Sequence, residues 1–217
     1  MSDNNMISLK DAMTAAVAAQ RVNGKYIKRH DAKEGELSNG VLMREFLNPE
    51  MVNFNHLSQD IEIAEQILEY LDSKMIELIA GTLHDYWKNL VLLTEQKAIK
   101  SNDFKTLALV ASVPNSYKNA VGRENSREEI RQIAENSKHI GKVGDNIATD
   151  VTIKSAVYSA NYNKWYHTAL TADQNLVCFP LSEQLERDTV VSLTARVHKH
   201  DDNNQTRLHY VRMKKDA

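Results

Sequence analysis

The amino-acid sequence predicts an α+β protein, in which a helical N-terminal domain (residues 1–142) is followed by a small β-barrel domain (residues 143–217). Apolar residues recur at helical spacing as far as about residue 139, and at every second position after Gly144. The second part contains five short candidate strands, with one or two helical turns expected between the third and the fourth. This combination suits a small closed five-stranded barrel.

The first predicted helix begins at Ser8 and ends at Gly24. Ser8 and Asp11 resemble a capping box, and glycine favours the left-handed conformation in which many helices end. The apolar positions of this helix are Leu9, Ala12, Met13, Ala16 and Val17. A polar stretch, residues 25–40, follows it.

Further helices are predicted over residues 41–47, 57–80, 82–100, 104–113 and 126–139. Gly81 separates the second of these from the third. Pro114 should end the helix over 104–113, because proline lacks the backbone N–H that a helix interior needs. Ser126 and Glu129 form a capping box at the start of the last helix, and Gly141 ends it.

Strands are predicted over residues 147–158, 162–171, 176–179, 189–199 and 206–213. Apolar and polar residues alternate along the first of them, which is typical of a half-buried strand. Residues 172–175 are expected to form a hairpin loop. Residues 181–187 are too polar and too short for a core strand, so helical turns are expected there, and residues 201–204 form a polar loop.

Composition excludes several classes of protein. The 217 residues include 27 Lys and Arg against 29 Asp and Glu, a net charge of −2 that excludes a globally basic nucleic-acid coat. No apolar run is long enough for a membrane span and the N-terminus lacks a signal-peptide pattern, so no membrane partner is expected. The single cysteine, Cys178, excludes an internal disulfide and indicates a reducing cytoplasm.

Several segments of the barrel resemble OB-fold-like domains of phage-encoded DNA-metabolism proteins that bind single-stranded DNA. The resemblance rests on Gly144-Asp145-Asn146-Ile147, Asp150-Val151-Thr152-Ile153, the aromatic run 162–166, and two longer segments, 195–200 and 205–212. It covers residues 144–213 only. The family's loop between the last two strands usually carries an aromatic residue and a glycine, and residues 201–204 contain neither.

The resemblance implies an OB barrel that holds single-stranded DNA or RNA with aromatic platforms and a basic groove. The residues expected to do so are Tyr158, Tyr162, Trp165, Tyr166, Arg196, Lys199, Arg207 and Arg212. The basic stretch 25–33 could extend the track. The alternative for the aromatic residues is that they are core or cross-strand packing. Because residues 140–217 hold ten Lys or Arg and nine Asp or Glu, binding requires the cations to gather on one face.

No residue pattern makes a positive case for catalysis. Neither a phosphate-binding glycine-rich loop nor a Gly-x-Ser-x-Gly elbow is present, so no catalytic residue, cofactor or resident metal is expected. Cys178 lies in an apolar strand and is expected to pack as a small hydrophobe. Two histidine clusters are weaker candidates for a metal site: His198, His200 and His209 with Asp201 or Asp202, and His84 and Asp85 with His56 and Asp60.

The sequence therefore supports three functional hypotheses. The first is a non-enzymatic single-stranded nucleic-acid-binding protein, phage-encoded and cytoplasmic in its host, whose helical domain provides homo-oligomerisation or partner docking. The second is an adaptor or inhibitor of a host factor whose OB-like barrel binds a protein, since one fold serves many functions. The third is a metal-dependent phosphohydrolase or nuclease, formed by the helical domain and fused to an OB module.

Overall fold

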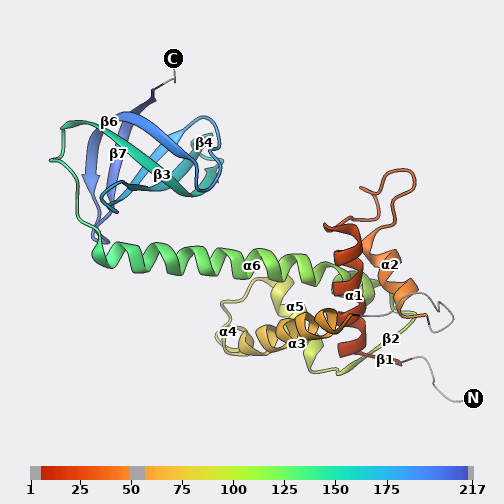
Figure 1. The fold of residues 1–217 in the computed structure, drawn as a ribbon. Helices are drawn as coiled ribbons and strands as arrows, with labels where there is room; N and C mark the ends of the chain where they lie inside the picture. The colour runs from red at the N-terminus through yellow and green to blue at the C-terminus, as the bar shows by residue number, and fades with distance from the viewer. Residues whose placement is uncertain (1–5, 49–56, 215–217) are drawn as a thin grey trace, which may run out of the picture. The chain divides into compact units, whose positions relative to one another are not determined.

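The computed structural model describes residues 6–48 and 57–214, and it confirms the α+β class. A helical region is followed by a closed five-stranded barrel (Figure 1). The chain divides into two compact units, Met1–Val121 and Gly122–Ala217, called here the first and second units. The division falls inside the longest helix, so each unit contains part of it. No helix within the described residues is long and apolar enough to cross a membrane.

The first unit is built around its first helix. Its elements are β1 (Met6–Ser8), α1 (Leu9–Asn23), α2 (Asn39–Phe46), α3 (Ser58–Ser73), α4 (Met75–Ile79), α5 (Asp85–Thr94), β2 (Ala98–Lys100) and the start of α6 (Phe104–Asn136). The strands β1 and β2 pair antiparallel. Nine of the fifteen residues of α1 are buried. Because most of them are alanines, α2 and α3 can pack closely against it.

The predicted ends of α1 are confirmed. Ser8 Oγ accepts a hydrogen bond from the backbone N–H of Asp11 at 3.0 Å, which satisfies one of the free donors of the first turn. Gly24 ends the helix with φ of 67°, a conformation that costs other residues more than glycine.

The predicted break at Pro114 is wrong. Helix α6 continues through Pro114 from Phe104 to Asn136. Proline in a helix interior forfeits one backbone hydrogen bond, but here it is buried with Val110 and Val113, and burial of apolar surface offsets that loss. The predicted capping box at Ser126 is also wrong, because its Oγ donates to the carbonyl of Gly122 from within the helix.

Three other boundaries differ from prediction. The helix expected over 57–80 is divided at Lys74 into α3 and α4, and the region 82–100 contains α5 and the short strand β2. Residues 182–189 form bends and turns and no helix, with Asp188 at a φ of 62°. Very short strands and turns of this kind depend on tertiary contacts, and the spacing of apolar residues in the sequence does not reveal those contacts.

All five predicted strands are present in the second unit. They are β3 (Asn146–Ser159), β4 (Lys164–Thr171), β5 (Leu176–Leu181), β6 (Val190–His200) and β7 (Thr206–Met213). They close in the order β3-β4-β5-β7-β6, with β3 pairing to β6. Every neighbouring pair is antiparallel except β5 and β7. This mixed, closed, five-stranded arrangement is compatible with an OB-like fold.

The end of α6 is fixed to one end of the barrel. Ser137 Oγ donates to the carbonyl of Asn204 at 3.0 Å and accepts from the N–H of Leu176 at 2.8 Å. Asn204 Nδ2 in turn donates to the carbonyl of Ala134. The hydrogen bonds of Ser137 and Ala134 with Asn204 are partly buried and hold the loop between β6 and β7, which borders the candidate site.

Candidate nucleic-acid interface

A β-bulge in β3 decides where the barrel's aromatic residues lie. Val151 and Ile153 face the core, and the pairing with β4 shifts by one residue between Ile153 and Ser155. Beyond the bulge, Tyr158 pairs with Trp165. Along β4, Trp165 is two residues from the buried His167 and therefore faces the same side of the strand. It lies nearer the strand's end and is not part of the buried core.

The four predicted aromatic residues are outside the barrel core. Tyr158 is 47% and Tyr162 is 68% exposed, and Trp165 and Tyr166 are half-buried. The rings of Tyr158 and Trp165 are 5.2 Å apart, and those of Tyr162 and Tyr166 are 6.2 Å apart. Cross-strand pairing therefore accounts for part of their placement, whereas burial in the core does not.

Two of the predicted cations share the outer face of the barrel with Tyr166. Cross-strand pairing aligns Thr168 of β4, Cys178 of β5, Arg207 of β7 and Lys199 of β6 in one row. The side chains of this row point outward. Tyr166, two residues from Thr168 along β4, points to the same side. Aromatic and basic side chains therefore lie together on the outer face of β4, β5, β7 and β6.

The carboxylate of Asp201 offsets both of these cations. It lies 3.3 Å from Lys199 Nζ and accepts a hydrogen bond from Arg207 Nε. Its partial burial on its own would raise the pKa of Asp201, but the hydrogen bonds from Arg207 and Lys199 outweigh this and lower it. Asp201 is therefore ionised at neutral pH, and the net positive charge of this part of the face is reduced.

The other two predicted cations, Arg196 and Arg212, line a groove of about 530 Å³ on the barrel surface between β3, β6 and β7. Arg196 and Tyr210 also border a second hollow, of about 280 Å³, together with His198 and His209. Since the two hollows share Arg196 and Tyr210, they form adjacent parts of one indented surface.

Tyr210 was missed by the sequence prediction. Strict alternation along β7 would place it inside with Leu208, yet it is 80% exposed. Its φ of 53° turns the strand, so that Val211 packs against the core and Tyr210 points outward. A left-handed tyrosine in a strand has no signal in a single sequence, so only the structure reveals this aromatic residue.

The barrel histidines, named from the sequence as a weak candidate for a metal site, are not brought together in one group in the structure. His198 stacks on His209 with ring centroids 3.8 Å apart, whereas His200 stacks on His139 at 4.3 Å. Over the ranges 6–48 and 57–214, no group of three or more metal-ligating side chains is assembled. Asp201 is engaged with the two cations instead.

Two of the candidate phosphohydrolase residues, His84 and Asp60, make hydrogen bonds that hold the fold together. His84 caps α5, and its Nδ1 accepts from the N–H of Tyr86 at 3.3 Å. Asp60 is buried and is held by both Nε and Nη2 of Arg21, each at 2.9 Å. His56 lies outside the described residues, and Asp85 is exposed in the first turn of α5.

Cys178 is half-buried on the outer face, between Thr168 and Arg207. Burial raises the pKa of its thiol to about 11. The thiol is therefore protonated at neutral pH, which does not suit a nucleophile. This environment agrees with the expectation that Cys178 packs as a small hydrophobe, although its strand position points away from the barrel core.

Comparisons with protein-family models, curated proteins and solved structures found no match for this chain. The functional assignment therefore depends on the geometry of the two units themselves.

Proposed function

We propose that the barrel binds single-stranded nucleic acid on the outer face of β4, β5, β7 and β6, and that it does so without catalysis. The observation that carries this proposal is the row of outward-facing positions that joins Tyr166 and Thr168 to Arg207 and Lys199. OB barrels bind oligonucleotides on the corresponding face, which is formed by their second and third strands and bordered by the first and fourth loops.

The chemistry of this face fits a flexible, charged strand. Exposed aromatic rings offer stacking surfaces for bases, and each stacked base contributes about 1–3 kcal/mol. Next to this face, in the groove between β3, β6 and β7, Arg196 and Arg212 would accept further phosphates of the strand. The hairpin between β3 and β4 contributes Tyr162 at one border of the face, in the position of the first OB loop.

The origin of the protein is part of the same proposal. The resemblance of residues 144–213 to OB-like segments of phage-encoded DNA-metabolism proteins supports a phage protein that acts on DNA in the cytoplasm of its host. The first unit would then provide self-association. Ile76 and Ile79 of α4, 77% and 81% exposed, support this role, because a second copy would cover apolar surface there.

A second candidate function is binding of a protein by the barrel. It is favoured by exposed apolar surface on β3 and in the β3–β4 hairpin, where Val157 is 65% exposed beside the aromatic residues. Salt separates the two functions, because phosphate contacts weaken steeply with ionic strength and a mostly apolar protein interface does not.

The experiment is fluorescence anisotropy of labelled single-stranded DNA, single-stranded RNA and duplex DNA, titrated with the full chain at two salt concentrations. We expect single strands to bind more tightly than the duplex, and Arg207→Gln to weaken the complex. Arg131→Gln is the matched control, since it removes one exposed arginine of the same unit that is paired with a carboxylate, Glu128, as Arg207 is with Asp201. Absence of single-strand binding at low salt would discard the proposal and favour the protein-binding alternative.

A further inference from the structure

We propose that a basic pocket in the first unit binds a phosphorylated nucleoside, either as a free nucleotide or as the phosphorylated end of a strand. The pocket lies among α2, the start of α6 and the loop that joins α1 to α2, and it has a volume of about 530 Å³. Ligand pockets in proteins typically have volumes of about 300–1,000 Å³. This site is separate from the barrel face and does not depend on the function proposed for it.

The formal charges that line the pocket come from Lys28, Arg29 and Arg44 and are all positive. Among the described residues no carboxylate lines it. Within the described residues, no ion pair holds Lys28, Arg29 or Arg44. His30 lies 3.4 Å from Asp31, which is outside the pocket. A concave surface lined by positive charges concentrates anions.

The N-terminus of α2 adds to this field. Ser38 and Gly40, at the start of that helix, line the pocket. The first turn of α2 contains no acidic residue. Ser38 is buried, with a relative exposure of 6%, and its hydroxyl accepts no capping hydrogen bond from the helix. The N–H groups of Asn39 and Val41 donate to the carbonyls of Ile27 and Ser38, but no acidic side chain offsets the positive end of the helix dipole, which would favour an anion at this position.

An aromatic ring at the pocket wall explains why a nucleoside fits better than phosphate alone. Phe104 is 61% exposed, an unusual environment for phenylalanine, and it lines the pocket together with Leu107 and Ala108. The guanidinium carbon of Arg44 lies 5.2 Å from the centre of its ring. This pair offers a flat apolar surface to a base and a cation to its phosphate within one pocket.

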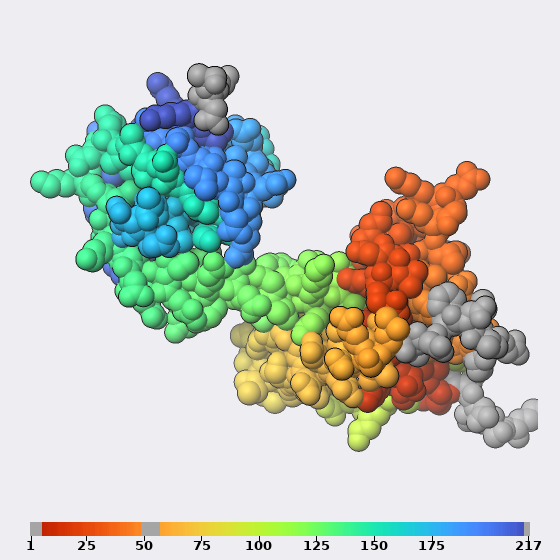
Figure 2. Space-filling model, viewed as in Figure 1, coloured from red at the N-terminus to blue at the C-terminus, as the bar shows by residue number. Residues whose placement is uncertain are grey.

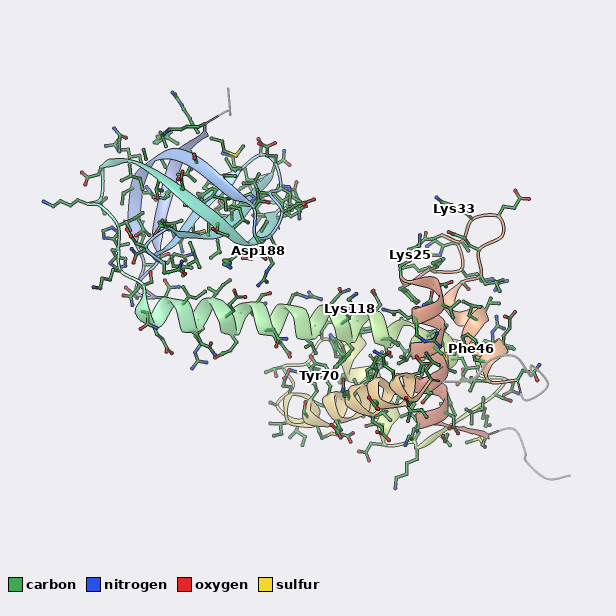
Figure 3. The ribbon with its side chains drawn as sticks, viewed as in Figure 1. Lys25, Lys33, Phe46, Tyr70, Lys118 and Asp188 are labelled. Atoms are coloured by element: carbon green, nitrogen blue, oxygen red, sulfur yellow. The ribbon has the colours of Figure 1, made fainter. Side chains whose placement is uncertain are left out.

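The surrounding loop is accessible to a ligand. In Figure 2 the segment between α1 and α2, drawn in orange, projects from the surface of the first unit. Figure 3 shows Lys25 and Lys33 on the same loop, and Lys25 directly precedes the pocket-lining segment 26–30, whereas the backbone N–H of Lys33 donates to the carboxylate of Glu36. The basic stretch singled out in the sequence therefore borders a pocket in the structure.

The test is isothermal titration of the full chain with ADP and, separately, with inorganic phosphate. We expect saturable ADP binding that is at least about tenfold tighter than phosphate binding, because one stacked base contributes about 1–3 kcal/mol. The double variant Lys28→Gln, Arg44→Gln should weaken ADP binding by at least about tenfold, and Phe104→Leu should weaken ADP binding but leave phosphate binding unchanged.

The matched control is the double variant Lys88→Gln, Lys118→Gln, which removes the same charge from exposed positions of the first unit outside the pocket. It should bind ADP like the wild type, and circular dichroism checks that every variant is folded. The proposal is overturned if ADP does not bind, if ADP and phosphate bind equally, or if the control weakens binding as much as the pocket variant.

The source of the nucleotide is decided by a second arm. Anisotropy compares 5′-phosphorylated and 5′-hydroxyl oligothymidine on a chain that carries Arg196→Gln and Arg212→Gln, which removes contacts proposed for the barrel. A 5′-phosphate preference that disappears with Lys28→Gln, Arg44→Gln identifies the strand end as the ligand. Pocket-dependent ADP binding without that preference identifies the free nucleotide. Because this arm does not need the barrel to bind, its outcome is independent of the function proposed above.

Discussion

Asp201 and Arg207 form an ion pair across the loop that joins β6 to β7, with Arg207 Nε 2.5 Å from Asp201 Oδ2. The same carboxylate holds Lys199. One acidic residue thus offsets two of the cations on the proposed binding face. Removing that carboxylate therefore tests whether the charge of the face controls binding.

Replacing Asp201 by Asn should strengthen single-strand binding. The change frees Lys199 and Arg207 for phosphates, so we expect affinity to rise by about three- to tenfold at low salt, with a steeper salt dependence. Asp202→Asn is the control, because it makes the same charge change at the neighbouring exposed position. Equal effects of the two variants in the anisotropy titration would contradict a specific role for Asp201.

Replacing Tyr166 by Ala should weaken single-strand binding by about five- to one-hundredfold, the loss of one stacked base. Tyr166→Phe keeps the ring and should retain most of the affinity, which separates stacking from hydrogen bonding by the hydroxyl. If the alanine variant binds like the wild type, the bases do not stack on this face. The measurement is the dissociation constant for labelled oligothymidine.

Replacing Asp60 by Asn should destabilise the first unit by about 1.5–3 kcal/mol, the range for hydrogen bonds to a charged group. The carboxylate is buried, accepts two hydrogen bonds from the partly exposed Arg21 and also accepts from the N–H of Leu57 at 2.9 Å, so the amide loses charge-assisted hydrogen bonds at a buried position. Urea unfolding measures the effect. An unchanged free energy of unfolding would show that Asp60 is not held for stability, and would reopen a catalytic reading of Asp60 with His84.

The barrel should lose stability as the pH falls below about 6.5, through His167. This imidazole is fully buried against Phe179, and its Nε2 accepts from the N–H of Leu185 at 3.0 Å. Burial lowers the pKa of His167 below its ordinary value of 6.5. The unfolded chain therefore binds the proton more readily than the folded chain, so stability is complete above pH 6.5 and declines between 6.5 and the folded-state pKa.

The comparison that isolates this effect is His167→Gln, which keeps an acceptor for Leu185 but does not titrate. We expect the variant to be less stable at pH 7.5, since it loses the ring contact with Phe179. Its free energy of unfolding should depend less on pH between 7 and 5 than that of the wild type. Parallel pH profiles would assign the acid sensitivity to another group.

The sequence predicted the elements that local patterns determine. The alternation of apolar residues placed β7 at 206–213, and Ser8 and Gly24 marked the ends of α1. It failed where tertiary contacts decide, as at Pro114, whose burial lets α6 continue. Such burial cannot be read from one residue's own propensity.

The candidate face was only partly predictable for the same reason. The residue types identified its cations and aromatic residues. They did not show which side of the barrel wall each residue faces, because irregularities at Lys154 and Tyr210 reverse the alternation of β3 and β7. The ion pair between Asp201 and Arg207 was not predictable either, because Asp201 lies in a loop whose conformation depends on contacts with the end of α6.

Binding of single-strand phosphates by the barrel is tested by the salt dependence of its affinity. The measurement compares the slope of log affinity against log salt for the wild type, for Arg196→Gln with Arg212→Gln, and for Arg127→Gln with Arg131→Gln. The last variant is the charge-matched control, because it changes two exposed arginines of α6 in the same unit. Each lost phosphate contact should reduce the slope by about 0.7, so the groove variant should fall by about 1.4 while the control stays near the wild type. Equal slopes in all three proteins, or no binding at low salt, would show that Arg196 and Arg212 do not hold the phosphates of a single strand.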